Sequence, residues 1–378
     1  MKNRLLHFGF VLTFILALAM PQVFLARPAH AEDAQKPSPV SPEDIKKALG
    51  LSVYLQGGYT YNFKDPKDGE NELRVFDHKA NSFTLDLAEI QFLRDAPVGG
   101  VGYKVKVSMG ETAKFIHSRG LGASDADEPF DLTEAYIDYV APVGKGLKLR
   151  FGKFVTMHGA EVIEAKDDYN YSRSFLFNYA IPFTHTGFMA AYTFSGMLSA
   201  NAYVVNGWDN SSDNNNGKTY GLSATVAPGA NSSLVFNLMY GPEQDHNDSD
   251  NRFLFDWVGT VKPVKDLTLV VNTDYATDKN LAGKGEDDKW YGIAGYVNYV
   301  FTERISGTIR AELFRDPQGV RTGTPQNLKE VTVTGQYTLA KNLLLRPEYR
   351  HDWSNEKSFD SGRSKSQDTI ALGVMYTW

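Results

Sequence analysis

From residue 51 to the C-terminus, apolar and polar residues alternate along the chain with a period of two. Between residues 328 and 339, Val331 and Val333 lie on one face, while Glu330 and Thr332 lie on the other. Successive side chains of a β-strand point to opposite faces, so this pattern predicts strands with one apolar and one polar face. Each alternating segment has about ten residues, which is the length at which a tilted strand crosses a membrane.

Sixteen segments of the chain show this alternation. They lie near residues 51–63, 81–94, 101–111, 130–141, 146–156, 184–195, 197–208, 218–227, 231–241, 252–262, 266–276, 289–301, 303–314, 328–339, 342–353 and 367–378. Around Leu87-Ala88-Glu89 the alternation slips in phase, which predicts a β-bulge in the second strand.

The connections between these segments alternate between short and long. The long ones cover residues 64–80, 112–129, 157–183, 209–217, 242–251, 277–288, 315–327 and 354–366. Transmembrane barrels have short periplasmic turns and longer external loops, whereas a soluble β-sandwich gives no reason for strict alternation. The chain is therefore predicted to be all-β: an antiparallel up-and-down transmembrane β-barrel of about 16 strands in a Gram-negative outer membrane.

The last alternating segment ends the chain on an aromatic residue. Ile370, Leu372, Val374, Tyr376 and Trp378 share one face of this strand. A final strand of this kind resembles the signal by which bacterial outer-membrane proteins are recognised for insertion. We therefore expect the barrel-assembly machinery to bind the strand that ends in Trp378.

The N-terminus has the pattern of a secretory signal peptide. A positive start with Lys2 and Arg4 is followed by an uncharged apolar run and by Ala29-His30-Ala31, which fits signal peptidase. We expect residues 1–31 to be removed, residues 32–50 to form a polar lead and a short helix, and residues 51–378 to form the barrel. Ser41 and Pro42 suit the start of that helix, and Gly50 suits its end.

Composition narrows the classes of function. Loss of Lys2, Arg4 and Arg27 with the signal peptide lowers the net charge from −6 to −9, which argues against a nucleic-acid partner. The chain has no cysteine, which excludes thiol catalysis, Fe–S ligation and cysteine-based zinc sites. We expect no cofactor and no metal site. Aromatic residues make up 13% of the chain, as suits the aromatic girdles of a membrane barrel.

Alternation also predicts which charged side chains face the lumen. About 16 strands leave an aqueous channel, and a charge that faced lipid at mid-depth would cost about 2–4 kcal/mol for Lys or Arg. The basic residues placed inside in this way are Lys104, Lys106, Lys148, Arg150, Arg310, Arg346 and Arg350. The acidic residues are Glu134, Asp138, Asp256, Asp274, Glu312 and Glu348.

The third long loop, residues 157–183, differs from the other connections. It carries apolar and aromatic residues that a fully wet external loop does not need, so we expect it to fold inward and narrow the pore. Its acidic residues would then oppose the basic wall of Lys104, Lys106, Lys148 and Arg150; they are Glu161, Glu164, Asp167 and Asp168. Opposed rows of charge would create a transverse field that screens solutes by charge and dipole.

The same region carries a family resemblance. Arg150-Phe151-Gly152-Lys153 leads into Gly159-x-Glu161, and these are followed by Asn170-x-Ser172-Arg173-Ser174, Pro182-x-x-His185-x-Gly187 and Tyr203-Val204-Val205-Asn206-Gly207-Trp208. The chain resembles the β-barrel porin-2, or OmpL-like, family. The resemblance covers most of the chain after the signal peptide, with its specific residues in 146–208. It implies an outer-membrane barrel of porin type and says little about the solute.

These patterns favour a porin: a water-filled channel for passive diffusion of small hydrophilic solutes or ions, with weak charge selectivity. Contact with outer-membrane lipid and lipopolysaccharide is expected, and a homotrimer is left open. A barrel enzyme or an adhesin without an open pore is the alternative. The histidines show no spacing of a metal or nucleophile site; after the signal peptide they are His78, His117, His158, His185, His246 and His351. No catalytic residue is therefore assigned.

Overall fold

The structure is a computed structural model that describes residues 41–122 and 129–378. The chain divides into two units, Met1–Ile45 and Lys46–Trp378. The signal peptide expected at residues 1–31 and most of the polar lead lie outside the described residues. Within the described part of the chain, no helix is long and apolar enough to cross a membrane.

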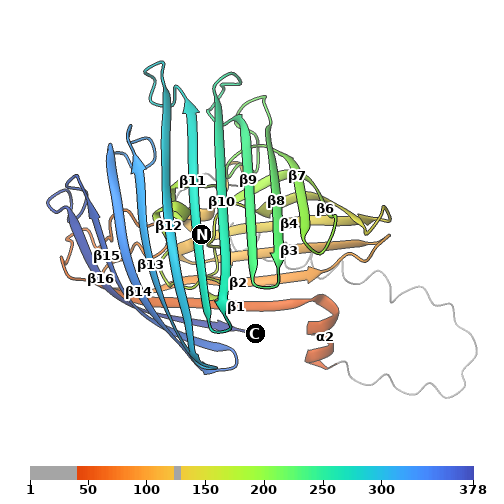
Figure 1. Ribbon diagram of the computed structural model, residues 1–378, viewed down its shortest axis with the longest axis horizontal. Coiled ribbons are helices and arrows are strands. Elements are labelled where there is room, and N and C mark those ends of the chain that lie inside the picture. Colours follow the sequence, from red (N-terminus) through yellow and green to blue (C-terminus); the bar gives the residue numbers. More distant parts are fainter. Residues whose placement is uncertain (1–40, 123–128) are drawn as a thin grey trace, which may run out of the picture. The chain divides into compact units, whose positions relative to one another are not determined.

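The second unit is a closed barrel of sixteen antiparallel strands, each paired with its neighbours in sequence (Figure 1). The ring closes where β1 pairs with β16, so the first and last strands lie side by side. The strands are β1 (Leu51–Asn62), β2 (Ser82–Arg94), β3 (Val101–Met109), β4 (Phe130–Ala141), β5 (Leu147–Val155), β6 (Thr184–Thr193), β7 (Leu198–Val205), β8 (Thr219–Gly229), β9 (Ser232–Pro242), β10 (Asn251–Val264), β11 (Leu267–Lys279), β12 (Asp287–Thr302), β13 (Ile305–Asp316), β14 (Gln326–Ala340), β15 (Leu343–Ser354) and β16 (Ser366–Thr377).

All sixteen predicted strands are confirmed, with ends that differ by a few residues. The predicted bulge is present, one residue earlier than expected. Gln56 on β1 pairs with Leu87, and Gly57 pairs with Leu85, so Asp86 is the extra residue on β2. Its carboxylate turns inward, where it accepts a hydrogen bond from the Tyr171 hydroxyl at 2.7 Å.

The outer face of the barrel carries the apolar half of each alternating strand. Phe83, Phe151 and Ile137 are 86%, 69% and 59% exposed. Side chains of this kind would be buried in a soluble protein. Their exposure around a closed ring is the arrangement expected of a wall that faces lipid.

A short helix, α2 (Pro42–Leu49), precedes β1. The Ser41 hydroxyl accepts a hydrogen bond from the Asp44 backbone N–H at 3.1 Å, which caps the first turn. Gly50, at φ +60°, ends the helix in the left-handed conformation that glycine tolerates best. The helix and both of its predicted ends are confirmed.

Candidate functional site: a loop across the lumen

The connection from β5 to β6 runs through the inside of the barrel. Its residues include the short turns η1 (Ala165–Asp167) and η2 (Leu176–Ala180). The Ala160 N–H donates to the Asn272 side chain on β11 at 3.1 Å, and the Glu164 carboxylate pairs with Lys106 on β3. Strands β3 and β11 stand eight apart in a ring of sixteen. The loop therefore reaches from one side of the lumen to the other.

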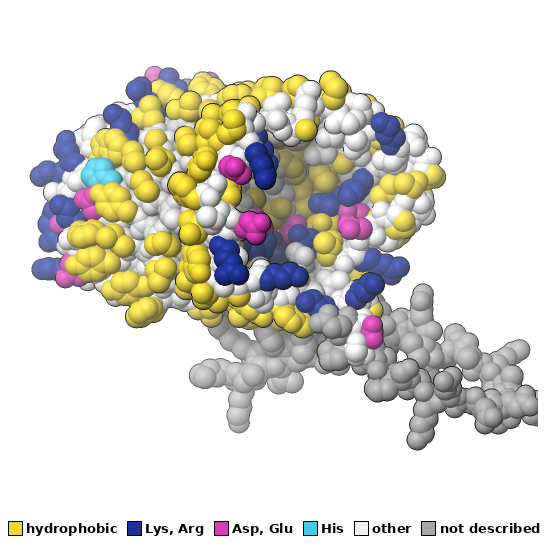
Figure 2. Space-filling view, turned by 60° about the horizontal axis from the view of Figure 1, so that its bottom comes forward, with side chains coloured by type: hydrophobic (Ala, Val, Ile, Leu, Met, Phe, Trp, Pro, Cys, Tyr) yellow, Lys and Arg dark blue, Asp and Glu magenta, His cyan; other side chains and the backbone are white. Residues whose placement is uncertain are grey.

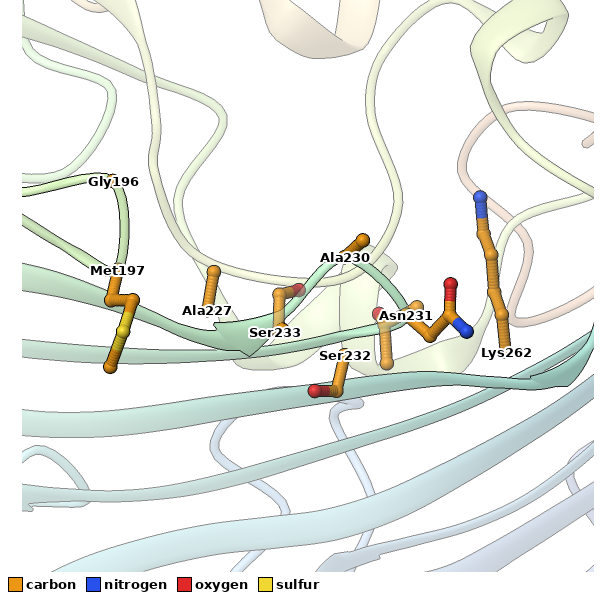
Figure 3. Close-up of a pocket in the computed structure, with 10 residues that line it drawn as sticks. Gly196, Met197, Ala227, Ala230, Asn231, Ser232, Ser233 and Lys262 are labelled. Carbon is orange, nitrogen blue, oxygen red and sulfur yellow. The ribbon is translucent and has the colours of Figure 1, made fainter.

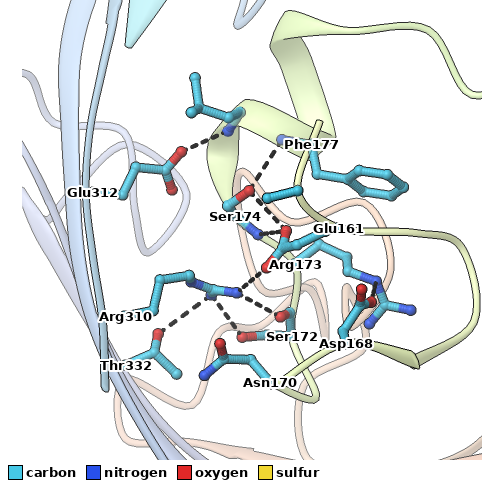
Figure 4. Close-up of polar contacts among 12 residues, drawn as sticks. Glu161, Asp168, Asn170, Ser172, Arg173, Ser174, Phe177, Arg310, Glu312 and Thr332 are labelled. Carbon is cyan, nitrogen blue, oxygen red and sulfur yellow. Dashed lines mark hydrogen bonds and ion pairs between the residues drawn. The ribbon is translucent and has the colours of Figure 1, made fainter. Parts of the chain in front are cut away.

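Arg310 on β13 forms the most densely bonded anchor of this loop (Figure 4). Its guanidinium donates to Glu161 at 2.7 Å and to the Ser172 carbonyl at 2.8 Å, both in the loop. On the wall side it donates to Glu330 of β14 at 2.7 Å. Arg310 has no exposed surface. One buried cation thus bonds a carboxylate of the loop, a backbone carbonyl of the loop and a carboxylate of the wall at the same time.

Two wall carboxylates hold the loop through its backbone. Glu312 on β13 accepts the Phe175 and Leu176 N–H groups, each at 2.6 Å. Glu348 on β15 accepts the Tyr171 and Ser172 N–H groups at 2.8 and 3.0 Å. A carboxylate suits the position of Glu312 because the N–H groups at the start of a helical turn, here η2, lack partners within the turn.

Two further arginines on β15 complete this contact. Arg346 donates to the carbonyls of Ala165 and Asn170, and Arg350 donates to the Arg173 carbonyl at 2.6 Å. Arg346 and Arg350 are 2% and 0% exposed, and Glu348 is 4% exposed. The wall formed by β13, β14 and β15 is therefore covered by the loop, and its charged side chains offer almost no surface to a passing solute.

The basic wall on β3 and β5 is paired differently from the sequence expectation. Lys104 pairs with Glu134 at 2.5 Å, and Arg150 pairs with Asp138 at 2.8 Å. The physical reason is the strand register, which sets Asp138 directly opposite Arg150 and Glu134 opposite Lys106, so that Lys104 is a diagonal neighbour of Glu134. Cross-strand neighbours on one face are close enough for their charges to pair.

The expectation that all four loop acids oppose this wall is accordingly wrong for three of them. Only Glu164 meets it, through Lys106. Glu161 pairs with Arg310 on the opposite wall, and Asp168 pairs within the loop with Arg173 at 3.0 Å. Asp167 pairs with its neighbour Lys166 and stays exposed.

Another part of the wall lines open space at the short-turn end. The loop forms hydrogen bonds with β1, β2, β3 and β9–β15. Near the turns of β6 to β10, small side chains such as Ala227, Ser233 and Thr260 border a cavity of about 640 Å³ (Figure 3). Seen from the short-turn end, the barrel is hollowed and edged by charged side chains, mostly basic (Figure 2).

The first long loop also folds over the third, which the sequence did not suggest. Arg74 donates to Asp352 on β15 at 2.6 Å and to Asp77 at 2.5 Å. The Phe76 ring lies 5.4 Å from the ring of Phe177 and 5.5 Å from that of Phe183. The available signal was the apolar pair Val75-Phe76 within an otherwise polar connection.

Partly buried acids link the long loops at the same end of the barrel. Asp209 accepts the Phe183 and Thr184 N–H groups, each at 2.8 Å. Glu243 accepts the Trp208 N–H at 2.8 Å and the Thr219 hydroxyl at 2.6 Å. Burial raises the pKa of Asp209, and it raises the pKa of Glu243 to about 7.

The two histidines that bracket the third loop do come together, with ring centres 6.5 Å apart. Nδ1 of His158 and Nε2 of His185 each lie 3.1 Å from the Thr156 hydroxyl. Burial lowers the pKa of His158 to about 3, which keeps it neutral. Across residues 41–122 and 129–378, no group of three or more His, Asp or Glu side chains is placed to hold a metal ion.

Comparison with known proteins agrees with this architecture. Residues 48–378 match the family described as "Putative beta-barrel porin-2, OmpL-like". Similar solved structures include Salmonella typhi OmpF in complex with daunomycin (13% identity, TM-score 0.61, covering 87% of this chain and 97% of that one). Others are an anion-selective porin from Comamonas acidovorans (10%, 0.60, 87% and 98%) and the channel DcaP of Acinetobacter baumannii (10%, 0.59, 87% and 96%). No curated protein sequence matches the chain.

Proposed function

Because the chain belongs to the OmpL-like β-barrel porin-2 family, its barrel is an outer-membrane channel for passive diffusion, and we propose that the loop of residues 157–183 forms the constriction of that channel. The observation that carries this proposal is the attachment of the loop to Lys106 on β3 and to Asn272 on β11. A segment fixed to opposite walls must reduce the cross-section that remains for water.

The path we propose runs between the loop and the wall of β4 to β8. The loop is bonded to the wall of β13–β15, so little space for solute remains there. On the other side, the side chains of Lys148 and Arg150 keep 42% and 16% of their surface exposed. Small side chains on the wall then leave the lumen wider toward the short-turn mouth. Charged side chains at the narrow part would meet each solute at close range.

We further propose that the charge selectivity of this path is weak. The basic side chains on β3 and β5 are Lys104, Lys106, Lys148 and Arg150. Four acids lie within 4 Å of them: Glu89, Glu134, Asp138 and Glu164. Equal numbers of both signs leave little net charge, but Lys148 is more exposed than the acid it faces. A modest preference for anions follows from that difference in exposure, since solvent-facing charge acts on passing ions.

We also propose three partners for the barrel: further copies of the same chain, lipopolysaccharide and the barrel-assembly machinery. A homotrimer is compatible with the relatives, one of which is described as a trimer form of Vibrio cholerae OmpT. Contact with lipopolysaccharide and delivery by the barrel-assembly machinery through the strand ending in Trp378 follow from an outer-membrane location. The alternatives are a barrel enzyme, which would need a catalytic group, and an adhesin without an open pore. The His158–His185 pair shares one threonine and offers no charged partner for nucleophilic chemistry.

Ion selectivity in a planar bilayer tests the path directly. We expect the double variant Lys148→Gln, Arg150→Gln to shift the reversal potential under a salt gradient toward cation permeability, because Asp138 loses both of its cations. Lys341→Gln, at an exposed short turn, is the matched control and should leave the potential unchanged. An unchanged potential in the double variant would place these residues away from the path. Absence of any conductance from folded, heat-modifiable protein would favour the enzyme or adhesin.

A further inference from the structure

Three cationic side chains mark the lipid-facing surface near the long-loop end. Lys289 on β12, Arg315 on β13 and Lys329 on β14 are all exposed. Each belongs to the outward set of its strand: Lys289 shares its face with Ile293, and Lys329 shares its face with Val331, which are 49% and 36% exposed on the outer wall. Charged residues on this face are expected only where the membrane interface begins.

The strand register places the three cations on one diagonal line, which we call the basic diagonal. Arg315 lies opposite Tyr291, two residues from Lys289, and Lys329 lies opposite Leu313, two residues from Arg315. Diagonal neighbours of this kind have Cβ atoms about 7–8 Å apart. Each cation is therefore within reach of the same ligand as the next one.

The cations of the basic diagonal form no ion pair with the carboxylates of residues 41–122 and 129–378. Other exposed cations at the long-loop end do: Lys279 pairs with Asp250 at 3.1 Å, and Lys218 pairs with Asp213. The guanidinium of Arg315 lies 6.0 Å from the ring centre of Tyr291 and has no carboxylate partner. Exposed Asp287 is the acid on the same face of β12, so the local charge stays positive.

The basic diagonal lies on the arc formed by β12, β13 and β14. At the long-loop ends of β3 and β4 the outward residues are apolar, namely Val107, Met109 and Leu132. Below the diagonal, toward mid-membrane, the outer wall is apolar, with Ile309 and Val333 51% and 48% exposed. An amphiphile with negative groups at its head and acyl chains below would match both surfaces at once.

We propose that the basic diagonal binds the phosphate groups of the phosphorylated glycolipid of the outer leaflet, lipopolysaccharide. Long loops mark the external side of such barrels, so the diagonal lies at the outer headgroup level. A guanidinium can hold a phosphate with two hydrogen bonds, and the flanking ammonium groups add charge without a fixed geometry. This proposal rests on the outer-membrane location and not on the proposed charge selectivity.

The test is binding of purified lipopolysaccharide to the full-length folded barrel in detergent, measured by native mass spectrometry. The variant is Lys289→Gln, Arg315→Gln, Lys329→Gln. Because each basic side chain near an anionic lipid surface contributes about fivefold, we expect roughly 100-fold weaker binding. The matched control, Lys265→Gln, Arg304→Gln, Lys341→Gln, removes three exposed cations at the short turns and should bind like the wild type.

Two further arms identify the ligand chemistry. Dephosphorylated lipopolysaccharide should bind the wild type as weakly as the intact lipid binds the triple variant. Inorganic phosphate at millimolar concentration should not compete, because it lacks the acyl chains. Equal binding by variant and wild type, equal binding of the dephosphorylated lipid, or full competition by free phosphate would each overturn the proposal. Reversal potentials of the triple variant should match the wild type, which keeps this test separate from that of the pore.

Discussion

Replacing Arg310 by methionine should loosen the loop across the lumen without removing it. Methionine keeps most of the apolar length of the side chain and deletes the guanidinium. Glu161 in the loop then loses its cation while it stays buried, at 5% exposed, and Glu330 on the wall keeps only Arg350, at 3.8 Å. The Ser172 carbonyl loses its donor as well. The perturbation thus acts on the contact between loop and wall, while the strand pairing of β13 is kept.

The expected cost follows from the burial of these groups. Breaking a buried ion pair by removal of one partner costs about 3–5 kcal/mol, because the remaining charge is left uncompensated. If only half of that cost destabilises the attached state of the loop, the free energy needed to detach the loop falls by about 2 kcal/mol. That change raises the detached fraction roughly 30-fold.

Limited trypsin digestion measures the detached fraction of the loop, because Arg173 is a cleavage site inside the loop and is fully buried in the intact structure. Cleavage at Arg173 should be roughly 30-fold faster in Arg310→Met than in the wild type when opening is fast relative to cleavage. Arg304→Met, at an exposed short turn, is the control and should change nothing. An unchanged cleavage rate in Arg310→Met would show that Arg310 does not hold the loop.

Three other predictions concern the surrounding structure. Burial raises the pKa of Glu243 from its ordinary 4.5 to about 7, so the stability that this carboxyl contributes below pH 4.5 is lost as the pH rises toward 7. In urea titrations Glu243→Gln should therefore lose less stability than the wild type between about pH 5 and 8, and equal losses would contradict this. Arg74→Met should release the first long loop by leaving Asp77 and Asp352 without their shared cation, which hydrogen exchange of residues 71–78 would report as lost protection; full protection would refute it. Gly152→Ala should lower the yield of refolded barrel, because Gly152 has φ +133° and a Cβ there would lie 2.2 Å from the Ala135 carbonyl; an unchanged yield would argue against this strain.

The strands, their order and the closed ring were predictable because each depends on local alternation and on connection length. A period of two fixes which face a residue takes, and the register then follows from the short turns. Even the bulge on β2 left a signal, as the slip of phase beside Asp86. The inward course of residues 157–183 was suggested by their apolar content, since such residues need something to pack against.

The pairing of the lumen charges was not predictable to the same extent. The sequence shows that Arg310, Arg346 and Glu161 face inward, but it does not show which of them meet. Arg310 and Glu161 are brought together by the path of a loop across the lumen, and the expected partners on β3 and β5 are instead taken by Glu134 and Asp138. The first long loop was missed because Arg74 and Phe76 find their partners only once the third loop is in place.

Single-channel conductance in a planar bilayer, compared between the wild type and a variant that lacks residues 160–180, measures directly whether the loop sets the size of the pore. The barrel wall stays complete in that variant, because β5 ends at Val155 and β6 begins at Thr184. We expect stepwise conductance from the wild type and larger steps from the variant, since the segment that narrows the lumen is gone. Equal steps from the two proteins would mean that the loop does not set the size of the pore.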